Sequence, residues 1–375
     1  MSLITRRTAL QLSAAVGVSA LLSAATTTKP SKTQPLTIGY VPIACAMPLI
    51  LADALGLFAS HGAAVKLKKF AGWADLWSAY ATDQLHVAHM LAPMPVAIDS
   101  GMTDAQRPTE LAFTQNTNGQ AITLATRHHG AVTTAQDFRG MVLGIPFEYS
   151  VHALLLRQFL ETGGVRPGED VELRLLRPAD MVAQLEVGTI DGFVGPEPFN
   201  QRAIASGAGR IFRLTRQLWD GHPCCSIAMA KDWKERHPET ARALVAALSE
   251  AALLADDDSF TPQLISIASS PTYLNQPAKL FEPVFSGRYR DWDSDKEVLD
   301  PLRVEYGGPT DPGALIWMTT QLTRWGLAGN AVPHTDEAII AASRAVLTDG
   351  TLPADLPDLT ISGDSFSPLA PTQGR

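Results

Sequence analysis

The sequence predicts an α/β fold of two lobes, and three observations support this prediction. From residue 35 onward, short β-rich runs alternate with amphipathic helical segments, which is typical of a sheet with helices on both faces. About 350 residues follow the N-terminal segment, more than one ordinary hydrophobic core accommodates. Apolar residues make up 46% of the chain and charged residues 18%, as in globular proteins.

The N-terminal segment has the layout of an export signal. Arg6 and Arg7 precede an uncharged apolar stretch, 9–22, and small residues close it at 23–25. About 14 apolar residues are too few for a membrane-spanning helix, which needs about 20. The paired arginines resemble a twin-arginine signal, with an ordinary secretory signal or an uncleaved tail as the alternatives. We therefore predict an export signal over 1–25 and a periplasmic protein, exported by the twin-arginine route.

A flexible leader is expected over 26–35, which is rich in Thr, Lys and Pro. No cysteine directly follows the apolar stretch, which argues against a lipid anchor. The formal charge is −8 and no basic block follows the signal, so nucleic-acid binding is not expected.

The predicted elements form two consecutive series of strands and helices. The first series has strands at 36–41, 65–70, 85–89, 111–113 and 121–125, with helices at 48–57 and 73–80. The second series has strands at 141–145, 171–176, 192–194 and 210–214, with helices at 151–162, 179–187 and 198–206. A strand at 226–230 follows, and the C-terminal third is expected to be mostly helical.

Several segments of the chain match one family in collinear order, over about residues 36–330. They include 39–42 (GYVP), 48–58 (PLILADALGLF), 71–76 (AGWADL), 88–95 (AHMLAPMP), 118–122 (NGQAI), 146–156 (PFEYSVHALLL) and 191–201 (DGFVGPEPFNQ). The chain thereby resembles the nitrate- and bicarbonate-binding proteins of bacterial ABC importers. Relatives of that family bind sulfonates, taurine or pyrimidine precursors of thiamine.

The resemblance implies the type II periplasmic-binding-protein fold, with two lobes joined by two crossing strands and a ligand cleft between them. The crossings are expected near 121–126 and 226–230. The implied domains are 36–123 (first lobe), 124–225 (second lobe), 226–350 (completion of the first lobe and C-terminal helices) and 351–375 (a loose tail).

The resemblance also implies a function without catalysis. The chain would be the extracytoplasmic solute-binding component of an ABC importer, closing its lobes on a small anion or small organic solute. Its partners would be the ligand and the transmembrane permease subunits, and no cofactor or metal is predicted. A monomer is expected, because both lobe tips must be free to dock. Two alternatives are a ligand-sensing regulator of the same fold and a pyrimidine-precursor synthase.

Six candidate ligand-binding residues lie at the matching positions. A tryptophan at a helix start overhangs the family's cleft, a polar turn offers amide and backbone N–H groups, and a histidine lies at a helix N-terminus that attracts anions. A glutamate between two prolines is rigidly placed to orient that histidine or the tryptophan, or to accept hydrogen bonds from a ligand. These residues are Trp73, Asn118, Gly119, Gln120, His152 and Glu197.

The seventh candidate, Cys225, marks a departure from the family. Nitrate- and bicarbonate-type members carry an anion-pairing lysine in the segment matching 222–225, where this chain has Cys225 or Cys224. The strand 39–42 is also followed by no acidic residue, which argues against a calcium–bicarbonate site. Nitrate is disfavoured too, because a buried anion would lack a cationic partner.

Three cysteines are too few for a disulfide framework. If Cys45 meets Cys224 and Cys225 in the cleft, the thiols could bind a soft metal or a thiol ligand, form one disulfide, or simply be buried and inert.

Overall fold

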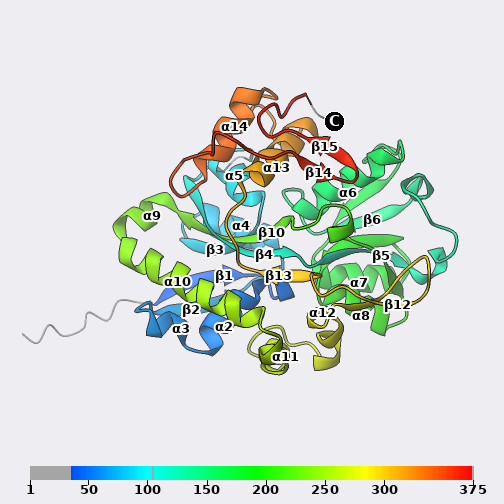
Figure 1. Cartoon of the computed structure of the whole chain (residues 1–375), viewed down its shortest axis with the longest axis horizontal. Helices are drawn as coiled ribbons and strands as arrows, with labels where there is room; N and C mark the ends of the chain where they lie inside the picture. The colour runs from blue at the N-terminus through cyan, green and yellow to red at the C-terminus, as the bar shows by residue number, and fades with distance from the viewer. Residues whose placement is uncertain (1–34, 104, 374–375) are drawn as a thin grey trace, which may run out of the picture. The chain divides into compact units, whose positions relative to one another are not determined.

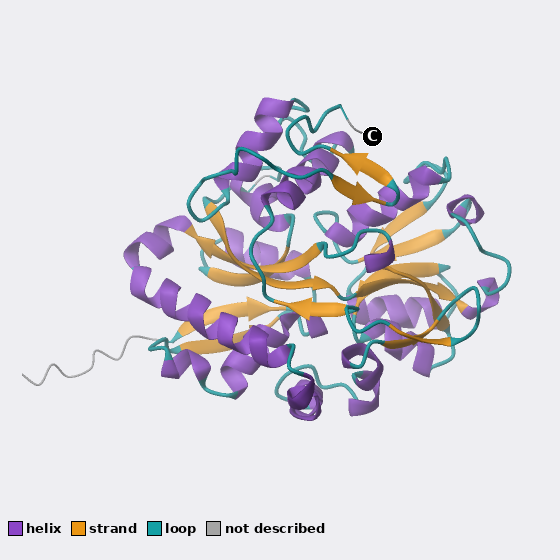
Figure 2. Ribbon diagram, in the orientation of Figure 1, coloured by secondary structure: helices purple, strands orange, loops and turns teal. Residues whose placement is uncertain are grey.

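Two β-sheets organise the chain in the computed structural model, which describes residues 35–103 and 105–373 (Figures 1 and 2). The predicted export signal and all but the last residue of the predicted leader lie outside the described residues. The described chain from Leu36 onward forms one unit. A continuous buried hydrophobic cluster includes strands of both sheets.

The first sheet has six strands in the order β13-β4-β10-β3-β1-β2. β1, β2 and β3 are parallel, whereas β10 runs antiparallel to β3 and β4. The edge strand β2 carries Lys66, Lys68 and Lys69, which discourage pairing with another chain. The inner strands are apolar and buried because helices cover them, as in other α/β sheets. The strands are β1 (Leu36–Tyr40), β2 (Val65–Lys69), β3 (Val87–Leu91), β4 (Thr109–Asn118), β10 (Pro223–Ala230) and β13 (Val304–Tyr306).

The second sheet has five strands in the order β7-β6-β8-β5-β9. β6, β7 and β8 are parallel, and β5 runs antiparallel to β8 and β9. The strands are β5 (Gln120–Ala125), β6 (Val142–Ile145), β7 (Glu172–Leu175), β8 (Gly192–Pro196) and β9 (Gly209–Leu214).

Helices connect these strands, and local signals set where they begin. Pro178 opens α7 in the first turn, where the missing N–H costs nothing, and the Ser150 hydroxyl accepts from the Ala153 N–H to cap α6. The α-helices are α2 (Met47–Ala54), α3 (Leu57–Ser60), α4 (Trp73–Ala81), α5 (Met94–Asp99), α6 (Val151–Thr162), α7 (Pro178–Glu186), α8 (Phe199–Ala205), α9 (Lys231–Arg236), α10 (Pro238–Ala255), α11 (Thr261–Ser269), α12 (Glu282–Phe285), α13 (Pro312–Arg324) and α14 (Asp336–Ala345). Short 3-10 turns occur at η1 (Ala44–Ala46), η2 (Thr126–His128), η3 (Ala135–Phe138), η4 (Thr215–Gln217), η5 (Asp258–Phe260) and η6 (Ala278–Leu280).

The chain passes between the sheets at other positions than predicted. β4 ends at Asn118 in the first sheet and β5 begins at Gln120 in the second, so the chain changes sheets at Gly119. It returns between β9 and β10, before Pro223. The predicted crossing segments are therefore wrong: 121–125 lies within the second sheet and 226–230 within the first. The sequence hid this because every one of these segments is β-rich.

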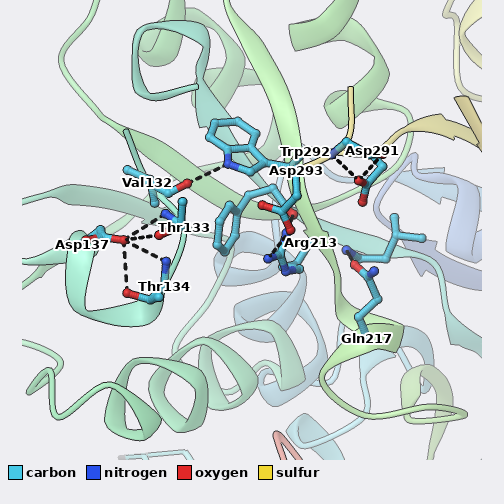
Figure 3. A network of polar contacts seen from close by, with 12 residues as sticks. Val132, Thr133, Thr134, Asp137, Arg213, Gln217, Asp291, Trp292 and Asp293 are labelled. Atoms are coloured by element: carbon cyan, nitrogen blue, oxygen red, sulfur yellow. Dashed lines mark hydrogen bonds and ion pairs between the residues drawn. The ribbon is translucent and has the colours of Figure 1, made fainter. Parts of the chain in front are cut away.

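The prediction that 226–350 completes the first lobe is also only partly right. The hairpin β11 (Arg288–Arg290) and β12 (Glu297–Leu299) lies against the second sheet. Trp292, between the two strands, donates from Nε1 to the Val132 carbonyl at 2.7 Å, and Arg213 of β9 pairs with Asp293 at 2.9 Å (Figure 3). The chain then rejoins the first sheet at β13.

The C-terminal residues are not the loose tail that the sequence predicted. β14 (Leu359–Ile361) and β15 (Asp364–Phe366) form a hairpin whose Ile361 and Phe366 side chains are buried. The Ser362 N–H donates to the Leu218 carbonyl at 2.6 Å, and Gln158 of α6 donates to Asp364 at 2.7 Å. Tertiary packing orders a segment whose Pro, Asp and Ser content is typical of loops.

Candidate functional site

Three cysteine side chains meet in the buried interior. The Cys224 sulfur lies 3.5 Å from the Cys225 sulfur and 3.9 Å from the Cys45 sulfur. All three residues are fully buried, and none is in a disulfide. The expected convergence is therefore confirmed, and neither proposed disulfide is present.

A bulge in β10 brings the two neighbouring cysteines together. Pro223 pairs with Thr117 of β4 and Cys225 with Asn116, so Cys224 is an extra residue with no partner on β4. Consecutive side chains of a regular strand point to opposite faces, whereas a bulge redirects a side chain. The irregular pairing therefore explains how two adjacent sulfurs come within 3.5 Å.

Gln120 connects the thiols to the second sheet. Its amide nitrogen lies 3.6 Å from the Cys45 sulfur, and its carbonyl oxygen accepts from the Thr215 hydroxyl at 3.3 Å. Thr215 in turn lies 2.9 Å from Nε2 of His222. Gln120 is thus the member of the predicted polar turn whose side chain faces the cysteines.

Two buried histidines have ring nitrogens without a hydrogen-bond partner. These are His152 at the start of α6 and His89 on β3, and neither is exposed. Burial lowers the pKa of His152 to about 3 and that of His89 to about 4, and both rings interact electrostatically with Cys45. Burial also lowers the pKa of His222 to about 4. All three imidazoles are neutral at pH 7, with a lone pair on one nitrogen each.

The pKa values of the three thiols are shifted in different directions. Hydrogen bonds from Cys224 and then Cys225 hold the pKa of Cys45 well below its usual range, whereas burial raises the pKa of Cys224 and of Cys225.

Trp73 is the first residue of α4, and the residue before it, Gly72, lies close to Arg177. The Trp73 indole Nε1 is buried without a partner. A Cβ atom on the preceding Gly72 would lie 2.9 Å from Arg177, the residue that precedes α7. A side chain at position 72 would therefore require the Arg177 side chain to move.

Asn118 and Gly119 hold the crossing between the sheets. The Asn118 side chain donates to the Leu302 carbonyl at 3.1 Å and accepts from the Gly221 N–H at 3.0 Å. Gly119 has φ of 88°, and its N–H donates to the Arg303 carbonyl at 2.8 Å. The polar groups of these two residues are thus engaged within the protein, unlike those of His152 and Trp73.

Glu197 pairs with a residue that the sequence analysis missed. Its carboxylate accepts a hydrogen bond from the Arg303 guanidinium, and both side chains are buried. Gln201 also donates to it, at 3.3 Å. The predicted contact with His152 or Trp73 is therefore wrong. A single arginine in the apolar stretch 301–306 (PLRVEY) was the available signal for a buried pair.

A large hollow of the described chain lies elsewhere. It has a volume of about 820 Å³, opens beside α9 and α10, and includes Lys234 and Glu110 in its lining. These two already form an ion pair at 2.6 Å. The unpartnered polar atoms at the thiols are the stronger sign of a binding site, because buried polar groups are nearly always hydrogen-bonded. Within the described ranges, no helix is long and apolar enough to cross a membrane.

Comparisons with known proteins assign the chain to a family. The profile of the NMT1-like family matches residues 29–269. The chain belongs to the NMT1-like family. Over 307 residues this NMT1-like protein is 32% identical to "Nitrate import ATP-binding protein NrtC" of Synechocystis sp., covering 78% of this chain and 46% of that relative. It spans about half the length of the first curated relatives that it matches.

Three further similarities concern binding proteins. The NMT1-like protein is 29% identical over 311 residues to the nitrate/nitrite binding protein NrtA of Nostoc sp., covering 77% of this chain and 70% of that one. Its structure resembles the periplasmic nitrate-binding protein NrtA from Synechocystis PCC 6803, with a TM-score of 0.82 and 25% identity over 90% of this chain and 96% of that one. The aliphatic sulphonate binding protein SsuA from Escherichia coli shares the fold, with a TM-score of 0.61 and 16% identity over 80% and 95% of the chains. The two-lobed periplasmic-binding-protein fold is thus confirmed.

Proposed function

We propose that this chain is the extracytoplasmic solute-binding component of an ABC importer and takes a small anion or small organic solute, nitrate-like or sulfonate-like. One observation carries the proposal. His152 interacts with Cys45 and has two unpartnered ring nitrogens, Gln120 reaches Cys45 from the second sheet, and the buried Trp73 indole also lacks a partner. The nitrate-binding relatives support this class of function.

The proposal extends to location and partners. The protein is periplasmic, exported through its N-terminal 25 residues, and acts as a monomer that presents its closed form to permease subunits. It contains no catalytic step. Relatives named as parts of nitrate and bicarbonate importers support the choice of partner.

The proposed contacts favour a ligand without a strong need for a cation. Arg303 is the buried cation near the crossing, and Glu197 already neutralises it. The unpartnered donors that remain are the Trp73 indole and a neutral imidazole of His152, since the Gln120 amide already donates to the Asn118 carbonyl and contacts the Cys45 sulfur. A ligand with its own amine or an apolar body suits these groups better than nitrate does.

A ligand panel tests the proposal. Calorimetry on the full-length chain would use nitrate, nitrite, bicarbonate, taurine, alkanesulfonates and pyrimidines. We expect at least one ligand to bind, and Trp73→Phe, which removes only the indole N–H, to weaken it by about tenfold, the value of a neutral hydrogen bond. Trp325→Phe is the matched control, because its N–H bonds Gln321 within α13 at 3.1 Å. Equal losses in both variants would contradict the proposed contact, and no binding by any solute, metal ions included, would contradict the function.

A further inference from the structure

The three cysteines form a preorganised set of soft ligands. Within the described ranges, this is a group of metal-ligating atoms that all lie within 4.8 Å of one another. A metal ion about 2.3 Å from each of three sulfurs requires sulfur–sulfur distances of about 3.8–4.0 Å. The sulfur–sulfur distances from Cys224, 3.5 Å to Cys225 and 3.9 Å to Cys45, are close to this range. Little movement is needed to admit an ion.

Two buried imidazoles lie beside the thiols without completing the set: among the described residues the ligand atoms within 4.8 Å of one another are the three sulfurs alone, so a ring must move to become the fourth ligand. His152 and His89 are buried, and both nitrogens of each ring are unpartnered. Buried polar groups are nearly always hydrogen-bonded, so unpartnered buried imidazoles call for an ion, a ligand or a bound water. The nearby carboxylate of Glu197 is already paired with Arg303. Sulfur with imidazole selects soft or borderline ions, whereas Mg²⁺ and Ca²⁺ require several oxygens.

We propose that Cys45, Cys224 and Cys225, with one of these imidazoles, bind a soft metal ion such as Zn(II) or Cu(I) as the solute or as part of it. The proposal rests on the proposed function, because it assumes that the thiols line the solute-binding site. The thiols come from η1 and β10 of the first sheet, and Gln120 reaches Cys45 from the second. An ion entering an open form would therefore find its sulfur ligands on one side and be covered by the other. The bulge at Cys224 is what presents two adjacent sulfurs to one ion.

Direct titration tests the site. The full-length chain, reduced and stripped of metal, would be titrated with Zn(II) and with Cu(I) against a chromophoric chelator, with Mg(II) and Ca(II) as hard-ion controls. We expect one soft ion per chain, and X-ray absorption showing three sulfur ligands and one nitrogen ligand. Replacing a residue that only hydrogen-bonds to a metal ligand already costs about 10–100-fold in affinity. Each of Cys45→Ser, Cys224→Ser and Cys225→Ser should therefore weaken binding by on the order of 100-fold or more.

Ser226→Ala is the matched control, because Ser226 is the next buried residue of the same strand and its hydroxyl has no partner. Cys→Ala variants at the three positions check that any loss is not misfolding, since alanine is tolerated in apolar surroundings.

Absence of stoichiometric soft-metal binding by the folded, reduced chain overturns the inference, as does binding that all three cysteine variants retain. If the chain then still binds an organic or anionic solute, the inference alone has failed. If it binds neither, the proposed function fails as well.

Discussion

Cys224 and Cys225 show how one residue of backbone irregularity changes a site. Regular strand geometry would turn these neighbours to opposite faces. The extra residue at position 224 places both sulfurs beside Cys45 instead. Cys45 and Cys225 were singled out from the family pattern, but the bulge depends on pairing with β4, more than 100 residues earlier in the chain, and no local pattern reveals it.

Replacing Cys225 with lysine tests whether the absence of the family's anion-pairing lysine weakens anion binding. Cys225→Lys should improve binding of nitrate or a small sulfonate about ten- to hundredfold, because a charge-assisted hydrogen bond contributes about 1.5–3 kcal/mol. Calorimetry on the folded variant measures this, and Cys225→Met, of similar bulk without the charge, is the control. Tight nitrate binding by the native chain and none by the lysine variant would show instead that the thiols belong to a nitrate site.

At the scale of elements, the sequence predicted the strands and helices of both sheets well where the pattern was strongly periodic. The helix predicted at 151–162 is α6 with the same bounds, Val151–Thr162. The sequence did not predict the hairpins β11–β12 and β14–β15, whose strands have three residues each, too few to show a period. The crossing at Gly119 was predicted a few residues late, because strand propensity is the same on both sides of it.

Gly119→Ala should destabilise the protein through the crossing. A left-handed backbone costs a residue with a Cβ about 1–2 kcal/mol, and the new atom would also lie 3.1 Å from Val304. Gly207→Ala is the control, since Gly207 has φ of 77° and open space around it. Urea unfolding should give a larger loss at 119 than at 207. Equal losses would show that crowding at the crossing contributes nothing.

At the scale of the molecule, buried polar groups link the two sheets. Arg303 precedes β13 of the first sheet, and Glu197 follows β8 of the second. Arg303 and Glu197 are 106 positions apart in the sequence, so only the folded structure reveals their ion pair. The two-lobed fold, by contrast, followed from the order of elements and the family resemblance.

Breaking this pair should be costly. Arg303→Met should reduce the free energy of unfolding by about 3–5 kcal/mol, because it leaves the Glu197 carboxylate buried without its partner. The double variant with Glu197→Met should recover part of that loss. Arg242→Met removes an exposed pair with Glu239 and should change stability by less than about 1 kcal/mol. A similar small loss at Arg303 in denaturant unfolding would show that water replaces the partner.

The three buried histidines predict a dependence of stability on pH in the metal-free protein. Their folded pKa values, about 3 for His152 and about 4 for His89 and His222, lie below the unfolded value of 6.5. The unfolded chain therefore binds more protons below pH 6.5, and stability is lost as the pH falls from 6.5 toward 4. Each histidine contributes a slope of up to about 1.4 kcal/mol per pH unit. Tm measured from pH 7.5 to 4.5 should fall, and His89→Gln should flatten the fall; an unchanged slope in that variant would show that His89 is hydrated.

The C-terminal hairpin has a consequence for how the protein is made. Asp364 binds Gln158, which the ribosome adds 206 residues earlier. At about 5–20 residues per second, the partner of Gln158 arrives some 10–40 s later. Ile361 and Phe366 are buried in the finished fold, so their contact surface stays uncovered during that interval. The final packing is therefore completed only after translation has nearly ended, and the nascent chain needs protection from aggregation until then.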